Sequence, residues 1–225
     1  MSEEKKKFRI QPIEYQETKD WLLHKHYAHR MPPISYAFGL YDESVLVGVC
    51  TFGIPANQFL VKGAFGGRFA DIFYELNRLI VNDNLPHNTL SFFVGGCLRM
   101  LPKPMIIVSY SDTSMNHHGY IYQATNFVYT GLTASHLIYK LEGEDNKHSR
   151  HLFDKYENIS QAKEQGIEMD VCQRARKHRY FYFIGSKRQK KNMQKYLLYP
   201  IMPYPKGDNG RYDASYNPTI QLTLF

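Results

Sequence analysis

The sequence has no apolar run of the length that crosses a membrane, and its first ten residues, MSEEKKKFRI, contain no apolar signal segment. Only three cysteines occur in 225 residues, and none has a metal-ligand spacing to another. These absences argue against membrane, secreted and disulfide-stapled classes, and the cysteines predict reduced core thiols in a cytoplasm. With 43% hydrophobic residues, the chain can bury one substantial core.

Acidic residues are missing from one long stretch, because none occurs between Asp170 and Asp208. That stretch interleaves basic residues with tyrosines and phenylalanines, in a chain of net charge +7. Basic side chains contact phosphates and aromatic rings stack on bases, so the pattern predicts nucleic-acid binding. The alternative is a solvated basic face around one buried strand, RYFYFIG. The candidate DNA-binding residues are Arg174, Arg176, Lys177, Arg179, Lys187, Arg188, Lys190 and Lys191.

Hydrophobic periodicity predicts an α/β domain with a mixed, mostly antiparallel sheet and helices on both faces. Regular pleating of strand 72–83 would place Glu75 and Arg78 on opposite faces. Residues 56–71 are glycine-rich and predict a mobile loop, and residues 142–170 predict an insertion or a helical excursion. Strands are expected over 8–13, 36–55 as a hairpin, 72–83, 105–112, 127–133 and 178–185, and helices over 14–29, 85–101, 117–126 and 189–199.

Three polar residues in the first half of this pattern are candidates for chemistry. His26, followed by Tyr27, ends the first helix, where an imidazole accepts a proton, binds a metal or interacts with the helix dipole. Arg78 lies within an apolar strand, where it either pairs with Asp112 or Glu75 or holds an anionic group. The amphipathic pattern of the first helix also predicts that Trp21, Leu22 and Tyr27 point inward.

Three further candidates follow along the chain. Ser91 opens a helix as a cap or a ligand donor, and Asn88 is the better plain cap. Asp112 ends a buried strand, where ligands gather in open sheets, or it caps the next helix. For Tyr122 there are three hypotheses: its phenol protonates a leaving group, it orients the donor, or its ring packs in the core.

The segments ELNRLIV, LPHNTLSFFVGGCLRML and IIVSYSD…GYIYQATNFVYTG resemble the GNAT acyltransferases. In that fold Gly119, Tyr122 and Phe127 would pack beside the acyl donor. The fold's usual pyrophosphate loop is rich in glycine, whereas LPHNTLS contains none. The resemblance thus implies the scaffold and an acyl-coenzyme A-like donor, but not the usual way of binding it.

A closer resemblance, over about residues 8–207, is to the phage Mom family. It rests on HYAHRMPP, ELNRL, NTLS, YSDTS, GYIYQATNF and KHRYFYFIGSKRQKK, in that order. The resemblance implies conversion of adenine in double-stranded DNA to an N6-carbamoylmethyl derivative, protection from restriction, and work in a bacterial host cytoplasm. It also implies that His26, Tyr27, Arg78, Ser91, Asp112 and Tyr122 are needed for activity.

Iron binding is the one metal hypothesis that the candidate residues suggest. His26 and Asp112 supply two ligands, whereas a facial triad requires two histidines and a carboxylate. A third ligand would have to come from His24, His29, His117 or His118.

The last five residues, QLTLF, resemble the peptide by which bacterial polymerases and repair proteins bind the sliding clamp. Leu224 and Phe225 would fill an apolar pocket, with Leu222 beside them and Gln221 anchoring the strand by hydrogen bonds. Residues 1–207 are then the catalytic domain, with a basic part over about 171–207, and residues 208–225 a tether with a clamp-binding tail. The alternatives are a fused edge strand for the tail, and an ordinary N-acyltransferase or a non-catalytic DNA-binding accessory for the chain.

Overall fold

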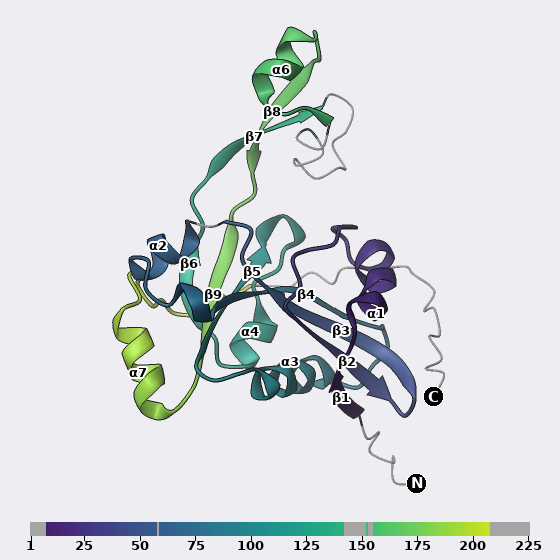
Figure 1. Cartoon of the computed structure of the whole chain (residues 1–225), viewed down its shortest axis with the longest axis vertical. Helices are drawn as coiled ribbons and strands as arrows, with labels where there is room; N and C mark the ends of the chain where they lie inside the picture. The colour runs from purple at the N-terminus through teal and green to yellow at the C-terminus, as the bar shows by residue number, and fades with distance from the viewer. Residues whose placement is uncertain (1–7, 58, 142–151, 153–154, 208–225) are drawn as a thin grey trace.

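The computed structural model describes residues 8–57, 59–141, 152 and 155–207, and Figure 1 shows their arrangement. A seven-stranded sheet has the strand order β1-β2-β3-β4-β5-β9-β6, and a separate pair, β7-β8, projects from it. The predicted tether and clamp-binding tail, 208–225, lies outside the described residues. Within these residues no helix is long and apolar enough to cross a membrane.

The sheet is mixed but mostly antiparallel, which confirms the predicted fold class. Strands β1 to β4 form an antiparallel meander, β4 and β5 run parallel, and β5, β9 and β6 are again antiparallel. The strands are β1 (Phe8–Pro12), β2 (Tyr36–Asp42), β3 (Val45–Gly53), β4 (Phe73–Val81), β5 (Met105–Asp112), β6 (Val128–Leu132) and β9 (Lys177–Ile184).

Helices cover both faces of this sheet, as the periodicity predicted. On one face α3 (Thr89–Met100) and α4 (Tyr120–Ala124) pack on the largest apolar cluster, which includes Phe93, Val94 and Tyr122. On the other face α2 (Leu60–Phe65) and α7 (Lys187–Lys195) share a second cluster, which includes Phe65 and Met193. The first helix, α1 (Tyr15–Asp20), leads into a third cluster.

The first helix widens after α1 into a π-helix over Trp21–Lys25. The amide of His26 donates to the carbonyl of Trp21 at 3.0 Å, and His26 itself is extended. Trp21 and Leu22 are buried as predicted, whereas Tyr27 is 43% exposed, so its inward placement was wrong. The wider turn moves the residues after Lys25 out of the α-helical register, and π-turns of this kind are frequent at functional sites.

Two predictions about irregular segments were also incomplete. The segment 56–71, predicted as a loop, contains α2, whose Leu60, Ala64 and Phe65 are buried. The strands β7 (His136–Leu141) and β8 (Met169–Arg174) flank the predicted insertion, and α6 (Ile159–Glu164) lies at its far end. Apolar residues three to four positions apart indicate the helix α2, and alternating apolar and polar residues indicate the strand β7. The many glycines in the first segment and the charged residues beside the second obscured these two patterns.

Gly53 is expected to be intolerant of a side chain, because the last residue of β3 touches the backbone before β2. A Cβ there would lie 1.9 Å from the Pro33 carbonyl oxygen. Since backbone on both sides must shift, Gly53→Ala should destabilise the fold by about 3 kcal/mol, measured by denaturant unfolding. Gly95→Ala is the control: its Cβ would meet only Arg99 at 3.4 Å inside α3, and it should stabilise by about 0.5 kcal/mol. Equal effects of the two variants would contradict this contact.

Candidate active site

A β-bulge in the middle of β4 sets the positions of the site residues. Thr51 of β3 pairs with Arg78, but the next residue, Phe52, pairs with Leu76, so Asn77 is an extra residue in β4. A bulge of this type moves every following side chain to the opposite face. The predicted regular pleat was therefore wrong at this point.

The packing of β4 on either side of the bulge confirms the change of face. Leu76 and Leu79, three residues apart, both contact the apolar cluster under α3. Phe73 and Ile80 contact the two clusters of the other face. Before the bulge, Glu75 is two residues from Phe73 and points to the same face of the sheet; after the bulge, Arg78 is two residues from Ile80 and points to the same face as Ile80. Glu75 and Arg78 consequently share one face of the sheet.

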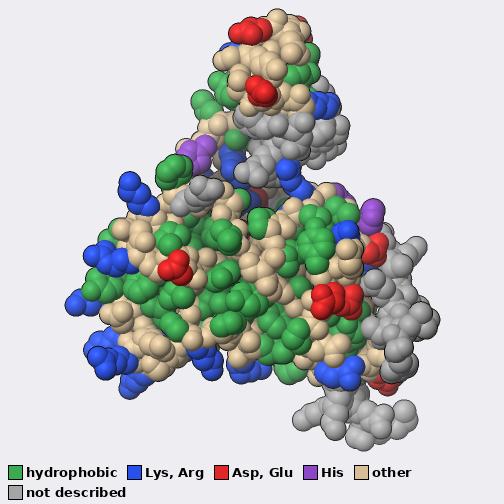
Figure 2. Space-filling model, viewed as in Figure 1, with side chains coloured by type: hydrophobic (Ala, Val, Ile, Leu, Met, Phe, Trp, Pro, Cys, Tyr) green, Lys and Arg blue, Asp and Glu red, His purple; other side chains and the backbone are tan. Residues whose placement is uncertain are grey.

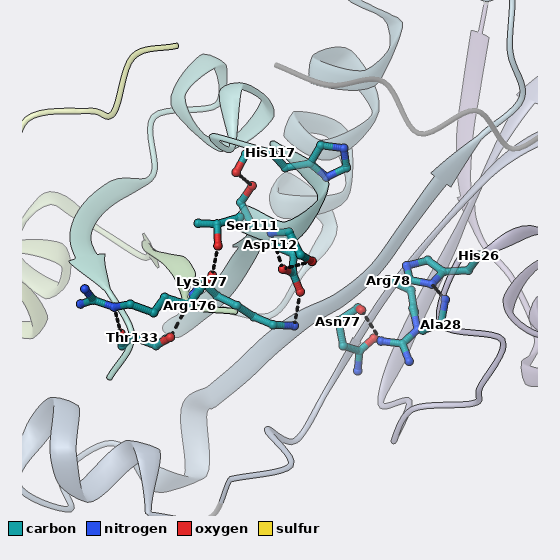
Figure 3. A network of polar contacts seen from close by, with 12 residues as sticks. His26, Ala28, Asn77, Arg78, Ser111, Asp112, His117, Thr133, Arg176 and Lys177 are labelled. Atoms are coloured by element: carbon teal, nitrogen blue, oxygen red, sulfur yellow. Dashed lines mark hydrogen bonds and ion pairs between the residues drawn. The ribbon is translucent and has the colours of Figure 1, made fainter. Parts of the chain in front are cut away.

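The bulge is tied to the chain that follows the first helix. The hydroxyl of Thr51 donates to Oδ1 of Asn77 at 2.6 Å, and Nδ2 of Asn77 donates to the carbonyl of Pro33 at 2.8 Å. The guanidinium of Arg78 donates to the carbonyls of Asn77 (2.7 Å) and Arg30 (3.2 Å). These bonds fix residues 30–33 over β4, and Figure 3 shows Asn77 and Arg78 next to His26 and Ala28.

Strands β4 and β5 diverge just beyond Glu75. Their pairing covers three residues on each strand and ends at Glu75 and Val108. Past that point the hydroxyl of Ser109 donates to the carbonyl of Leu76 at 2.9 Å. The buried Tyr122 hydrogen-bonds with Ser109 from the α4 side, and burial raises the pKa of its phenol. The two strands therefore open where the site residues lie.

Glu75 is the acidic group at this opening, although sequence reasoning gave it no catalytic role. Burial raises the pKa of its carboxyl to about 7, even though the positive charges of Lys177 and Arg78 both lower it. The phenol of Tyr110, whose pKa is raised by burial, also interacts with Glu75. A carboxyl that gains and loses its proton near neutrality is suited to general acid–base chemistry. The signal that would have found Glu75 is the bulge, which strand periodicity does not reveal.

His26 is buried where the π-helix ends, and it is neutral. Burial first, and then the charges of Arg78, His29 and Lys177, lower its pKa to about 3. Its Nδ1 accepts a hydrogen bond from the amide of Ala28 at 3.0 Å, so the proton of the neutral ring is on Nε2. His26 thus offers a hydrogen-bond donor. The ring of Tyr27 lies 4.3 Å from that of His26, centroid to centroid, and remains exposed.

Asp112 forms an ion pair with Lys177, its direct partner across β5 and β9. The Lys177 Nζ lies 3.1 Å from Oδ2, and Oδ1 accepts from the amide (3.0 Å) and hydroxyl (2.7 Å) of Ser114. Asp112 therefore caps the 3₁₀ turn Thr113–Met115, as its alternative prediction stated. Burial alone would raise the pKa of Asp112, but these hydrogen bonds and Lys177 together lower it.

Lys177 was predicted to contact DNA, yet it lies within the site. Its charge acts on Asp112, Glu75 and His26 alike. In Figure 3 its side chain extends toward Asp112, and its amino group ends at the Asp112 carboxylate. Lys177 is therefore the cation that connects the residues on β5 with those on β4 and the first helix.

The six predicted catalytic residues fall into separate groups. His26, Tyr27 and Arg78 lie close together, and Asp112 reaches them through Lys177. Tyr122 is inserted from the α4 side, near the opening of the strands. Ser91 lies at the start of α3, where its hydroxyl donates to the carbonyl of Asn88 at 2.9 Å. Asn88 precedes α3 in a left-handed conformation, and its side chain forms no cap.

The geometry does not fit the iron hypothesis. Among the described residues no group of three or more histidine, cysteine, aspartate or glutamate side chains is placed to hold a metal ion. Nε2 of His26 carries the proton, and both oxygens of Asp112 are already engaged by Ser114 and Lys177. At the start of α3, Thr89 and Ser91 both donate their hydroxyls to local carbonyls.

The predicted DNA-binding residues are distributed over two surfaces and the interior. Arg179 is buried: its guanidinium donates to Thr130 and lies 3.4 Å from the centroid of the Tyr199 ring. Arg174 and Arg176 are exposed where β8 leaves the body. The other four are on α7, whose single buried side chain is Met193, and they are Lys187, Arg188, Lys190 and Lys191.

Two comparisons with known proteins cover most of the chain. The chain matches the Mom protein family over residues 7–206, a range that contains every residue of the site. It is 27% identical over 217 residues to the methylcarbamoylase mom of Escherichia phage Mu, covering 89% of this chain and 85% of that protein. The chain belongs to the Mom protein family.

Solved structures with a similar arrangement are N-acetyltransferases. The crystal structure of Arabidopsis thaliana NAA60 with acetyl-CoA superposes with a TM-score of 0.49 at 8% identity, over 79% of this chain and 99% of that one. An N-acetyltransferase from Staphylococcus aureus Mu50 gives 0.44 at 10% identity, over 79% and 98%.

Replacing the Glu75 carboxyl by an amide should change how stability depends on pH. Because the folded pKa is raised, the stabilisation from the protonated carboxyl is complete below about pH 4.5 and is lost as pH rises through about 7. Glu75→Gln should therefore raise the melting temperature relative to the native chain by an increment that grows over this range, to about 5 °C at pH 8. The control is Glu164→Gln, at an exposed position of α6. An increment independent of pH would contradict the burial of Glu75.

Proposed function

We propose that this chain is a transferase that modifies phage DNA, converting adenine to its N6-carbamoylmethyl derivative and so protecting the DNA from host restriction. The observation that carries the proposal is the match to the Mom family over residues 7–206, together with 27% identity to a methylcarbamoylase. The arrangement of Glu75, Arg78, Lys177 and His26 supports it, since these groups can promote transfer to a weakly nucleophilic amine.

The proposed chemistry needs a group that removes a proton from the exocyclic amine. The N6 lone pair is delocalised into the purine ring, so the amine gains nucleophilicity only as it loses a proton. As the new N6–C bond forms, the Glu75 carboxylate accepts that proton, and the leaving group of the donor departs with the bonding electrons. The pKa of about 7 suits Glu75 to this task near neutral pH.

The neighbouring cations keep part of Glu75 ionised. Arg78 and Lys177 both lower its pKa, which burial alone would place higher. His26, with its proton on Nε2, donates a hydrogen bond to the substrate and is not the base in this tautomer. Tyr122, whose raised pKa keeps it protonated, orients the group that enters between β4 and β5.

The DNA substrate would be held by the exposed basic side chains. α7 presents Lys187, Arg188 and Lys191 to solvent on a segment without acidic residues. Phosphate contacts of this kind position a duplex without specifying its sequence. Because the site residues face a buried part of the sheet, the adenine would have to leave the base stack to reach them.

Mass spectrometry of nucleosides from plasmid DNA of bacteria that express the chain tests this function. The native chain should yield a heavier deoxyadenosine, whose mass identifies the added group. Glu75→Gln and His26→Ala should each lower its amount by at least about a hundredfold, since each removes a group on the reacting atoms. Glu164→Gln, on exposed α6, should retain the native yield.

Unmodified deoxyadenosine from a folded native chain would contradict the proposal and favour an N-acyltransferase or a DNA-binding accessory. If Glu75→Gln gave the native yield while His26→Ala was inactive, the role of Glu75 as the base would be rejected and the proposed function would stand.

We also propose that the QLTLF segment recruits the enzyme to the bacterial sliding clamp. The sequence of Gln221, Leu222, Leu224 and Phe225 supports this, and these residues lie outside the described part of the chain. Tethering raises the effective concentration of DNA near the site without adding a contact to it. In the same experiment, deletion of residues 221–225 should lower modification in cells but leave modification by the purified protein unchanged.

A further inference from the structure

The β7-β8 pair, with α6 at its end, forms an arm that projects from the body of the protein (Figure 1). Its base is bound to the turn that Asp112 caps: the hydroxyl of Thr113 donates to the carbonyl of Arg176 at 2.6 Å. On the β6 side, Arg176 Nε donates to the carbonyl of Thr133 (2.7 Å), and the amide of Lys177 donates to the Thr133 hydroxyl (3.0 Å). The direction of the arm is therefore fixed relative to the Asp112–Lys177 pair.

One face of the arm carries exposed apolar side chains. Leu137 pairs with Gln173, and Tyr139 pairs with Val171, so these four side chains share a face. Leu137 is 70% exposed and Val171 is 54% exposed. A core or structural role would bury these side chains, so their exposure points to contact with another molecule.

Charge is distributed unevenly along the arm. Arg174 and Arg176, at its base, are exposed and lie in the segment without acidic residues. Further out, four exposed acidic residues, Glu157, Glu164, Glu168 and Asp170, outnumber two exposed lysines, Lys155 and Lys163, among the described residues. Figure 2 shows acidic side chains near the tip, with a basic one beside them, and further basic side chains near the base. A polyanion next to the site would thus be attracted more strongly to the base of the arm than to its outer part.

We propose that the base half of the arm, residues 135–137 and 171–176, is a DNA-binding ribbon that holds the duplex beside the active site. A two-stranded ribbon has the width that the major groove admits. Leu137 and Val171 would contact base edges or sugars there, while the long side chains of Arg174, from the opposite face, and Arg176, from the base of the ribbon, reach phosphates on the flanks. The inference rests on the proposed function, because it takes duplex DNA as the substrate.

A protein partner is less consistent with this surface. Stable protein interfaces bury about 800 Å² on each partner around a dense apolar centre. The arm offers two well-exposed aliphatic side chains with Gln173 next to both, whereas Arg174, which pairs with His136, lies on the opposite face. Self-association through this face is the alternative, and sedimentation of the variants distinguishes it from DNA binding.

The test compares full-length variants in two measurements: affinity for a fluorescent duplex of about 25 base pairs at several salt concentrations, and modification of plasmid DNA. Leu137→Ser with Val171→Ser should weaken binding about tenfold, since both side chains lose their apolar contact. Arg174→Ala with Arg176→Ala should reduce the slope of log affinity against log salt by about 2. Met100→Ser, which removes a 43% exposed apolar side chain from α3, is the matched control and should bind as the native chain does.

The outcomes separate this inference from the proposed function. Native binding and salt dependence in both arm variants, while the native chain modifies adenine, would overturn the inference and leave the function intact. Weakened binding in the arm variants, with no modified adenine from any form, would support the ribbon and reject the function. A concentration-dependent dimer in sedimentation that Leu137→Ser with Val171→Ser abolishes, without a change in DNA binding, would reassign the face to self-association.

Discussion

The extra residue at Asn77 in β4 is the feature on which the site depends. Without it, Glu75 and Arg78 would point to opposite faces of the sheet, one toward α3 and the other toward the first helix. Thr51 and the Pro33 carbonyl hold the Asn77 amide, and the close approach of Pro33 is possible because Gly53 has no Cβ. The bulge thus both selects the face of Glu75 and fixes the chain after His26.

The electrostatics of the site follow from this placement. Two cations, Arg78 and Lys177, act on one partly buried carboxyl, Glu75, and burial together with the same cations keeps His26 neutral. Asp112 balances Lys177 across the β5-β9 pair, so the lysine is held in place when Glu75 is protonated. The positions of Arg78, Lys177 and Asp112 thus set the protonation of their neighbours, so that an ionisable carboxyl and a neutral imidazole coexist at neutral pH.

The sheet, most helices and several residues near the site could be predicted from the sequence, because the periodicity of apolar residues indicates which side chains are buried. Sequence reasoning missed Glu75 for a physical reason: a bulge leaves no mark on alternation when the residues beside it, such as Asn77, are polar. It assigned Lys177 and Arg179 to DNA on composition, although cross-strand pairing places one in the site and the other in the interior. The strands β7 and β8 were missed because charged residues beside them dominated the pattern. The roles of the predicted site residues and the tail stay predictions.

The most direct test is a ¹³C NMR titration of the Glu75 side-chain carboxyl in the native chain and in Arg78→Met. If the two residues share a face, Glu75 should titrate near pH 7 in the native chain. Its pKa should rise further in Arg78→Met, because a charge that stabilises the carboxylate is lost. A Glu75 carboxyl that titrates near its ordinary value and is unmoved by Arg78→Met would contradict the account, since it would place Glu75 on the opposite face of β4.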